Sequence, residues 1–135
     1  MSEGGLTVAV VGLGFGQDFI PIYLSHPLVE RVVLVEPDAA HLREVAERFD
    51  IRDSYADLTE ALNDPTIDAV HILAPVHFHA DFSVAVLAAG KHCACAVPMA
   101  TSLADIDRII AAQASSGKNY MMMETAVYGD RKSVV

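Results

Sequence analysis

Short apolar runs alternate along this chain with segments in which apolar residues recur at helical spacing. The runs cover residues 8–11, 32–35, 69–73, 92–97 and 120–123, and a short segment near Ser54 and Tyr55 could also pair as a strand. Runs of this length, several of them rich in β-branched residues, predict buried strands, whereas a 3.6-residue period predicts helices. Strand and helix alternate throughout, which predicts an α/β fold: one doubly wound parallel sheet covered by helices on both faces.

Polar and turn residues mark the predicted helices near the start of the chain. Asp38 can cap a helix whose apolar positions run from Leu42 to Phe49. Residues 57–60 form a capping box that opens a brief helix. Pro21 lies inside the first crossover, where it removes a backbone donor, so we expect a short or bent helix there.

Two further helices are predicted in the second half of the chain. Residues 77–89 are helical by their apolar stripe, and Gly90 is a natural left-handed end. A last helix starts at Thr101 or Ser102 and closes at Gly117. The stripe of the first of these two helices is Phe78, Phe82, Val86 and Leu87.

The first strand runs directly into three alternating glycines, Gly12, Gly14 and Gly16. Glycines allow a tight turn, and the following helix points free N–H groups at an anion, so the loop suits the pyrophosphate of a dinucleotide. The dinucleotide fingerprint expects its third glycine five residues after the first, where this chain has Gln17. An ordinary strand-to-helix turn without a ligand is the alternative.

An acidic residue, Glu36, ends the second predicted strand twenty-two residues beyond Gly14. The acidic partner of an adenosine ribose belongs at this point of a dinucleotide-binding unit. A carboxylate accepts hydrogen bonds from free ribose hydroxyls and repels a 2′-phosphate, so the sequence favours NAD over NADP.

Length and charge narrow the possible classes of protein. The 135 residues, 53% of them apolar, predict one domain over residues 1–128, followed by a tail over 129–135. A net charge of −9 argues against nucleic acid and anionic membranes as partners. The N-terminus lacks the features of a signal peptide and no run is long enough to span a bilayer, so we expect a cytoplasmic protein.

Several segments together resemble the N-terminal half of the Gfo/Idh/MocA family of glucose-fructose oxidoreductases and inositol dehydrogenases. Besides the glycine loop and Glu36, the resemblance is carried by residues 73–79 (LAPVHFH), 89–92 (AGKH) and 98–100 (PMA). It implies a Rossmann domain that binds NAD(P), with Ala74, Pro75 and His79 beside the dinucleotide. The expected cofactor-binding residues are Gly12, Leu13, Gly14, Phe15, Gly16, Gln17, Glu36, Pro37, Ala74, Pro75, His79 and Pro98.

The chain departs from that family just before Pro98, where members usually carry Glu-Lys-Pro and this chain has Ala96-Val97-Pro98. In the family the lysine helps to bind cofactor and substrate and assists proton transfer, which valine cannot do. The family's second, substrate-binding domain is also absent from this sequence. We therefore assign no catalytic residue and expect the chain alone to be catalytically incomplete. Glu124 and Tyr128 face either the nicotinamide, as in a longer member, or solvent.

Two other functions remain open from the sequence. The glycine spacing also fits the loop of an S-adenosylmethionine-dependent methyltransferase, although Val10 stands where such loops usually have an acidic residue. A non-catalytic module that binds a dinucleotide and self-associates is the other alternative. The apolar last strand, residues 120–123, would lack the cover of following structure, so we expect a homo-oligomer through this strand or its adjoining face.

Histidines and cysteines suggest other chemistry but lack its spacing. His77, His79, Cys93 and Cys95 could in principle hold zinc, yet neither pair has structural zinc spacing, and we predict no metal site. Thiols in a buried strand stay neutral and inert, so we interpret both cysteines as core residues. The remaining candidates, His26 and His41, are expected to be solvated and receive no role.

Overall fold

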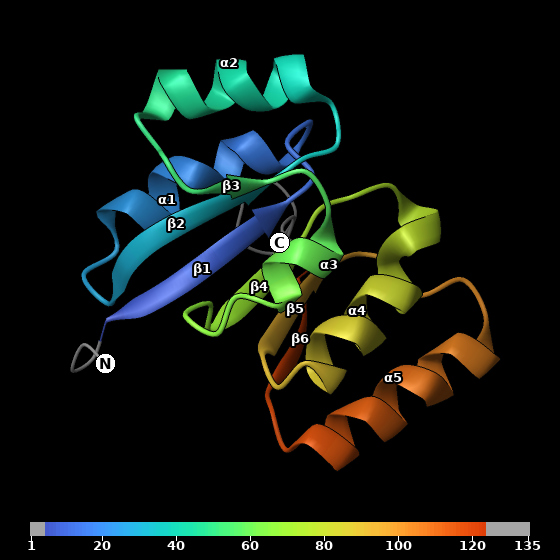
Figure 1. Ribbon diagram of the computed structural model, residues 1–135. Helices are drawn as coiled ribbons and strands as arrows, with labels where there is room; N and C mark the ends of the chain where they lie inside the picture. Colours follow the sequence, from blue (N-terminus) through green and yellow to red (C-terminus); the bar gives the residue numbers. More distant parts are fainter. Residues whose placement is uncertain (1–4, 124–135) are drawn as a thin grey trace, which may run out of the picture.

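The structure, a computed structural model that describes residues 5–123, contains a six-stranded parallel sheet with helices on both faces (Figure 1). The strands lie in the order β3-β2-β1-β4-β5-β6, so the chain starts in the middle of the sheet and winds to each edge in turn. The predicted doubly wound, Rossmann-type arrangement is confirmed. Its strands are β1 (Leu6–Val11), β2 (Val29–Val35), β3 (Ser54–Tyr55), β4 (Ala69–Ile72), β5 (His92–Ala96) and β6 (Tyr120–Met123).

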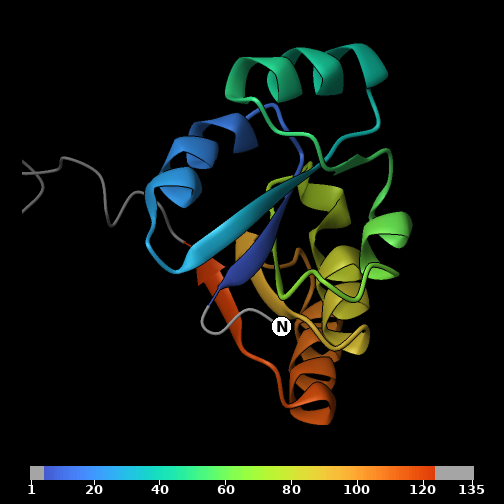
Figure 2. The same cartoon turned by 60° about the vertical axis from the view of Figure 1, so that its left-hand side comes forward.

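The helices divide between the two faces of the sheet, as the view in Figure 2 shows. Successive side chains of β1 point to opposite faces of the sheet. Val10 packs with Ile20 and Val45 on one face, whereas Ala9 and Val11 belong to the core on the other face. The first face carries η1 (Gly16–Phe19), α1 (Ile20–Ser25) and α2 (Ala39–Phe49); the second carries α3 (Leu58–Leu62), α4 (His79–Ala88) and α5 (Leu103–Ser116).

The predicted helix signals correspond to observed caps. The Asp38 side chain accepts hydrogen bonds from Ala40 N and His41 N, and Asp57 accepts one from Glu60 N. Gly117 ends α5 with a φ of 70°. Pro21 lies in the first turn of α1, which has only six residues and follows a 3₁₀ turn, so the expected short helix is confirmed.

The predicted helix over residues 77–89 is only partly correct. Its first residues form a separate 3₁₀ turn, η2 (Val76–Phe78), and α4 begins at His79. Val86 and Leu87 are fully buried, whereas the Phe78 side chain at the turn is 39% exposed. The Phe78 ring, at the start of the apolar stripe, is therefore accessible and can line a surface site.

Candidate functional site

The loops that follow β1, β2, β4 and β5 meet at one edge of the sheet, above the point between β1 and β4 where the chain reverses its winding. Ligands of doubly wound sheets bind at this place. Two pockets open here, one of about 520 Å³ and one of about 390 Å³. They are adjacent and form one candidate site, because both are lined by Gly12, Glu36, Ala74 and Pro75.

Gly12 brings the end of β1 against the loop after β4. Its φ is +92°, and a Cβ at this position would lie 2.7 Å from Ala74 N and 2.8 Å from Leu73 O. Its own N–H donates to Val35 O at 3.0 Å, which continues the pairing with β2. Only glycine combines this backbone conformation with so close an approach.

The Glu36 carboxylate holds the turn after β1 against the turn after β2. Oε1 accepts a hydrogen bond from Leu13 N at 2.9 Å, and Oε2 accepts one from Asp38 N at 3.1 Å. The Leu13 side chain itself is completely buried in the core beneath the loop. A carboxylate oxygen can accept more than one hydrogen bond, so Glu36 keeps acceptor capacity toward the pockets.

Helix α2 also contacts the glycine loop. His41 Nε2 donates to Leu13 O at 3.0 Å, and Arg48 donates to Gln17 Oε1. The pKa of His41 is raised, mainly by the hydrogen bond to Leu13 O. Partial loss of hydration opposes this shift, and the nearby Glu44 and Glu36 carboxylates add to it. His41 remains partly solvated, as predicted, with its side chain 27% exposed, but its ring also contacts Leu13, which lines the larger pocket.

His79 joins the loop after β4 to the loop after β5. The imidazole is 2% exposed, with Nδ1 2.6 Å from Pro98 O and Nε2 2.8 Å from Ala74 O. Carbonyl oxygens only accept, so each contact is a hydrogen bond when the ring nitrogen that makes it carries the proton. The Val97–Pro98 peptide bond is cis, and Val97 lines the larger pocket.

The structure gathers most of the predicted cofactor-binding residues at this edge. The three that line neither pocket are Gly16, Gln17 and Pro98. A Cβ on Gly16 would lie 3.2 Å from Val10 Cγ1, so this glycine lets η1 pack against β1. The nine that line one or both pockets are Gly12, Leu13, Gly14, Phe15, Glu36, Pro37, Ala74, Pro75 and His79.

Sequence reasoning missed the aromatic wall of the smaller pocket. Phe78 and Phe82 both line it, with ring centroids 4.9 Å apart and planes inclined by 14°. The spacing of four residues places Phe78 and Phe82 on one helix face. The sequence does not show that this face is open to the pocket, which follows from the 3₁₀ turn at Phe78. Asp57 also lines this pocket while it caps α3.

The cysteines are core residues, as predicted. Both Cys93 and Cys95 are buried free thiols, and burial raises the pKa of Cys93 to about 12. Within residues 5–123, no group of three or more His, Cys, Asp and Glu side chains is placed to hold a metal ion. The helices of the same stretch include none that is long and apolar enough to cross a bilayer. Glu124, Tyr128 and the predicted tail lie outside the described residues.

Comparison with known proteins identifies the family. The sequence profile of the Gfo/Idh/MocA group, described as "Oxidoreductase family, NAD-binding Rossmann fold", matches residues 6–124. The chain therefore belongs to this family.

Its relatives are considerably longer proteins. The chain is 31% identical to the 4-carboxy-2-hydroxymuconate-6-semialdehyde dehydrogenase of Sphingobium sp., covering 89% of this chain and 38% of that protein. It is 30% identical to the inositol 2-dehydrogenase of Salmonella paratyphi B, covering 87% of this chain and 36% of that protein. The crystal structure of GenD2 from gentamicin A biosynthesis, in complex with NAD, matches with a TM-score of 0.86 and 28% identity over 96% of this chain and 38% of GenD2.

Proposed function

We propose that this chain binds NAD across the two joined pockets at the carboxyl edge of the sheet. The adenosine half would occupy the pocket of about 390 Å³, with the Glu36 carboxylate accepting from the ribose hydroxyls. The diphosphate would lie over the backbone from Gly12 to Gly16, and the nicotinamide half would enter the pocket of about 520 Å³. The observation that carries this proposal is that the two adjacent pockets share Gly12 and Glu36 in their linings.

Calorimetry with NAD and S-adenosylmethionine tests the proposal, with Gly14→Ala as the diagnostic variant. No atom lies within 4 Å of a Cβ built on Gly14, so the variant should fold normally. The added methyl group would stand where the diphosphate approaches the backbone, and we expect NAD affinity to fall about tenfold or more. Equal unfolding temperatures serve as the control. Tighter binding of S-adenosylmethionine would favour a methyltransferase, and unchanged NAD binding by Gly14→Ala would place the ligand elsewhere.

Discrimination against NADP would come from the charge of Glu36. Glu36→Gln keeps a side-chain oxygen that can accept from Leu13 N but removes the negative charge that repels a 2′-phosphate. We expect the ratio of NAD to NADP affinity to fall by about tenfold. An unchanged ratio would mean that another group sets the preference.

We further propose that the chain alone does not catalyse hydride transfer. The Val97 side chain lines the pocket assigned to nicotinamide, and it has neither the positive charge nor the proton that a lysine would bring. The chain also spans less than two fifths of the length of the dehydrogenases named above. A sugar- or polyol-like substrate, as the family resemblance implies, would then depend on protein surface outside this domain. NADH formation with inositol by the isolated chain would refute the proposal.

Self-association through the edge of β6 is a second proposal. This strand is the last of the sheet order, and its Met121 and Met122 side chains are 56% and 45% exposed. An exposed apolar edge strand favours pairing with another chain. Light scattering should show a mass that rises with concentration, and a constant monomer mass would exclude this contact.

A further inference from the structure

Helix α2 holds the peptide bond between Leu13 and Gly14 by its carbonyl group. His41, in the first turn of α2, donates from Nε2 to Leu13 O at 3.0 Å. This peptide bond is trans, since the only cis bond within residues 5–123 is Val97–Pro98. In a trans peptide the C=O and N–H groups point in opposite directions. The Gly14 N–H therefore points away from His41.

The next peptide bond of the loop is held in the same way, through Gln17. Gly14 O accepts from Gln17 Nε2 at 3.1 Å, and Gln17 Oε1 accepts from Arg48 in the last turn of α2. By the same geometry the Phe15 N–H points away from Gln17. Gln17 stands where the dinucleotide fingerprint expects its third glycine, and this relay to α2 gives its side chain a structural role.

The Gly14 N–H is a donor without an internal partner at the larger pocket. Gly14 lines this pocket, and among residues 5–123 no backbone oxygen accepts from its N–H. The neighbouring Leu13 N–H is already taken by Glu36 Oε1. A backbone N–H at a pocket, without an internal partner, is the kind of donor that a diphosphate oxygen accepts.

We propose that His41 is a positioning residue of the dinucleotide site, which orients the Leu13–Gly14 peptide toward the diphosphate and binds NAD more tightly when its ring is protonated. Arg48, acting through Gln17, orients the next peptide with a smaller effect, because its contact is exposed. This inference rests on the proposed binding of NAD, and it adds regulation of that same site by protons.

The charges around the His41 ring give the direction of the pH dependence. Glu44 Oε1, on the same helix, lies 3.5 Å from Nδ1, Glu36 is the nearby carboxylate at the end of β2, and the glycine loop presents Leu13 O. The hydrogen bond to Leu13 O, more than the two carboxylates, raises the pKa of His41 against an opposing loss of hydration. A protonated ring still donates to Leu13 O and adds a positive charge beside the loop. NAD affinity should therefore fall as pH rises through the pKa of His41.

Calorimetry of NAD binding by the full chain, from about pH 5.5 to about pH 8.5, tests this inference. We expect affinity to fall about threefold as the His41 ring loses its proton. By linkage, NAD binding should also take up a fraction of a proton, which is measured from the binding heats in buffers of different ionisation enthalpy.

Two substitutions of His41 separate its hydrogen bond from its charge. His41→Gln keeps an amide that can donate to Leu13 O but cannot titrate, so we expect the affinity of the parent chain at high pH to persist at every pH, without proton uptake. His41→Ala removes donor and charge together and should bind NAD about fivefold more weakly than His41→Gln. Arg48→Ala should weaken binding about twofold, equally at each pH.

A measurement without ligand tests the link between the ring and the peptide. In NMR spectra of the full chain, the Gly14 amide signal should shift with pH as the His41 ring titrates, and this shift should be absent in His41→Gln. A Gly14 signal that does not respond to the protonation of His41 would show that the ring does not orient this peptide.

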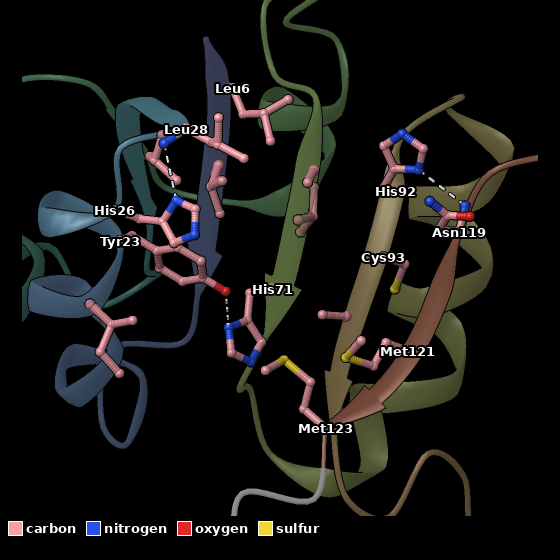
Figure 3. Close-up of a pocket in the computed structure, with 16 residues that line it drawn as sticks. Leu6, Tyr23, His26, Leu28, His71, His92, Cys93, Asn119, Met121 and Met123 are labelled. Carbon is pink, nitrogen blue, oxygen red and sulfur yellow. Dashed lines mark hydrogen bonds between the residues drawn. The ribbon is translucent and has the colours of Figure 1, made fainter. Parts of the chain in front are cut away.

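His26→Gln is the matched control, because it makes the same exchange at an exposed histidine. The His26 Nδ1 accepts from Leu28 N beside a separate groove on the sheet (Figure 3), outside both pockets of the site. Its NAD affinity should follow that of the parent chain at every pH. Equal NAD affinity of His41→Ala and the parent, or a pH dependence that His41→Gln retains, would overturn this inference and leave the proposed function intact. A parent chain that binds no NAD at any pH would refute both.

Discussion

The carboxyl edge of the sheet, and the face of β4 to β6 that the helices of residues 5–123 leave uncovered, each contain a buried histidine, and the two use their rings differently. At the edge, both ring nitrogens of His79 meet backbone carbonyls, so the side chain fixes two loops. On the face, His71 meets Tyr23 through one nitrogen, and its other nitrogen has no partner among residues 5–123. The edge is thus a site organised by its own hydrogen bonds, whereas on the face the described residues leave a buried ring nitrogen unsatisfied.

The largest effect should come from a substitution that forces apart the two loops in contact at the carboxyl edge, those after β1 and β4. Gly12→Ala would force a Cβ against Ala74 N and Leu73 O at a φ of +92°, so we expect the free energy of unfolding to fall by about 4 kcal/mol. Urea unfolding measures this change. Gly90→Ala is the matched control, since its φ is +79° but no atom lies within 4 Å of the new Cβ, and it should lose only about 1 kcal/mol. Equal losses would mean that backbone conformation, and not the close approach, requires Gly12.

Removing the His79 ring should have the next largest effect. His79→Ala removes the buried imidazole that contacts Pro98 O and Ala74 O, and we expect a loss of about 3 kcal/mol in unfolding free energy. NAD affinity should fall as well, because both loops line or adjoin the proposed site. His77→Ala, at the exposed neighbouring histidine, should change neither quantity. A stable His79→Ala variant would show that the loops are held by other contacts.

Differences in sequence separation explain which parts of the site could be predicted. Gly12, Gly14 and Glu36 were identifiable because their roles follow from local backbone geometry and a spacing along the chain. His79 was predicted from the family resemblance, but its contact with Pro98 O, 19 residues away, and that of His41 with Leu13 O, 28 residues away, come only from the packing of the β5 loop and α2. His71 looked like one more strand residue, because the sequence gives the alternation of β4 but not which helices cover each face. Five of the six strands were predictable from their apolar runs, whereas β3, the two residues Ser54–Tyr55, has no such run.

Lowering the pH should reduce the free energy of unfolding through His71 on the sheet face, by an amount between those expected for the His79 and Phe78 substitutions. The pKa of His71 is lowered from 6.5 to about 4, so the unfolded chain binds more protons between these values and stability falls as pH decreases through this window. From pH 7 to pH 5 we expect a loss of about 2 kcal/mol that His71→Gln does not show, measured by urea unfolding at each pH. The pKa of Asp64, lowered to about 2, contributes only at lower pH, below the ordinary carboxyl value of 3.8. An identical pH dependence in both proteins would mean that the His71 ring is hydrated.

The smallest expected effect is on ligand affinity, and it distinguishes the two pockets at the carboxyl edge from each other. Phe78 lies in the pocket assigned to adenosine, stacked on Phe82, and it is absent from the larger pocket. Phe78→Ala should leave stability nearly unchanged, since the side chain is 39% exposed, but should remove an aromatic surface that contributes about 1 kcal/mol, or about fivefold, to binding of the adenine ring. Calorimetry with ADP-ribose should show the same loss as NAD, whereas nicotinamide mononucleotide should bind as it does to the parent chain. A loss confined to nicotinamide mononucleotide would reverse the assignment of the two halves, because the pocket next to Glu36 and Phe78 would then hold the nicotinamide.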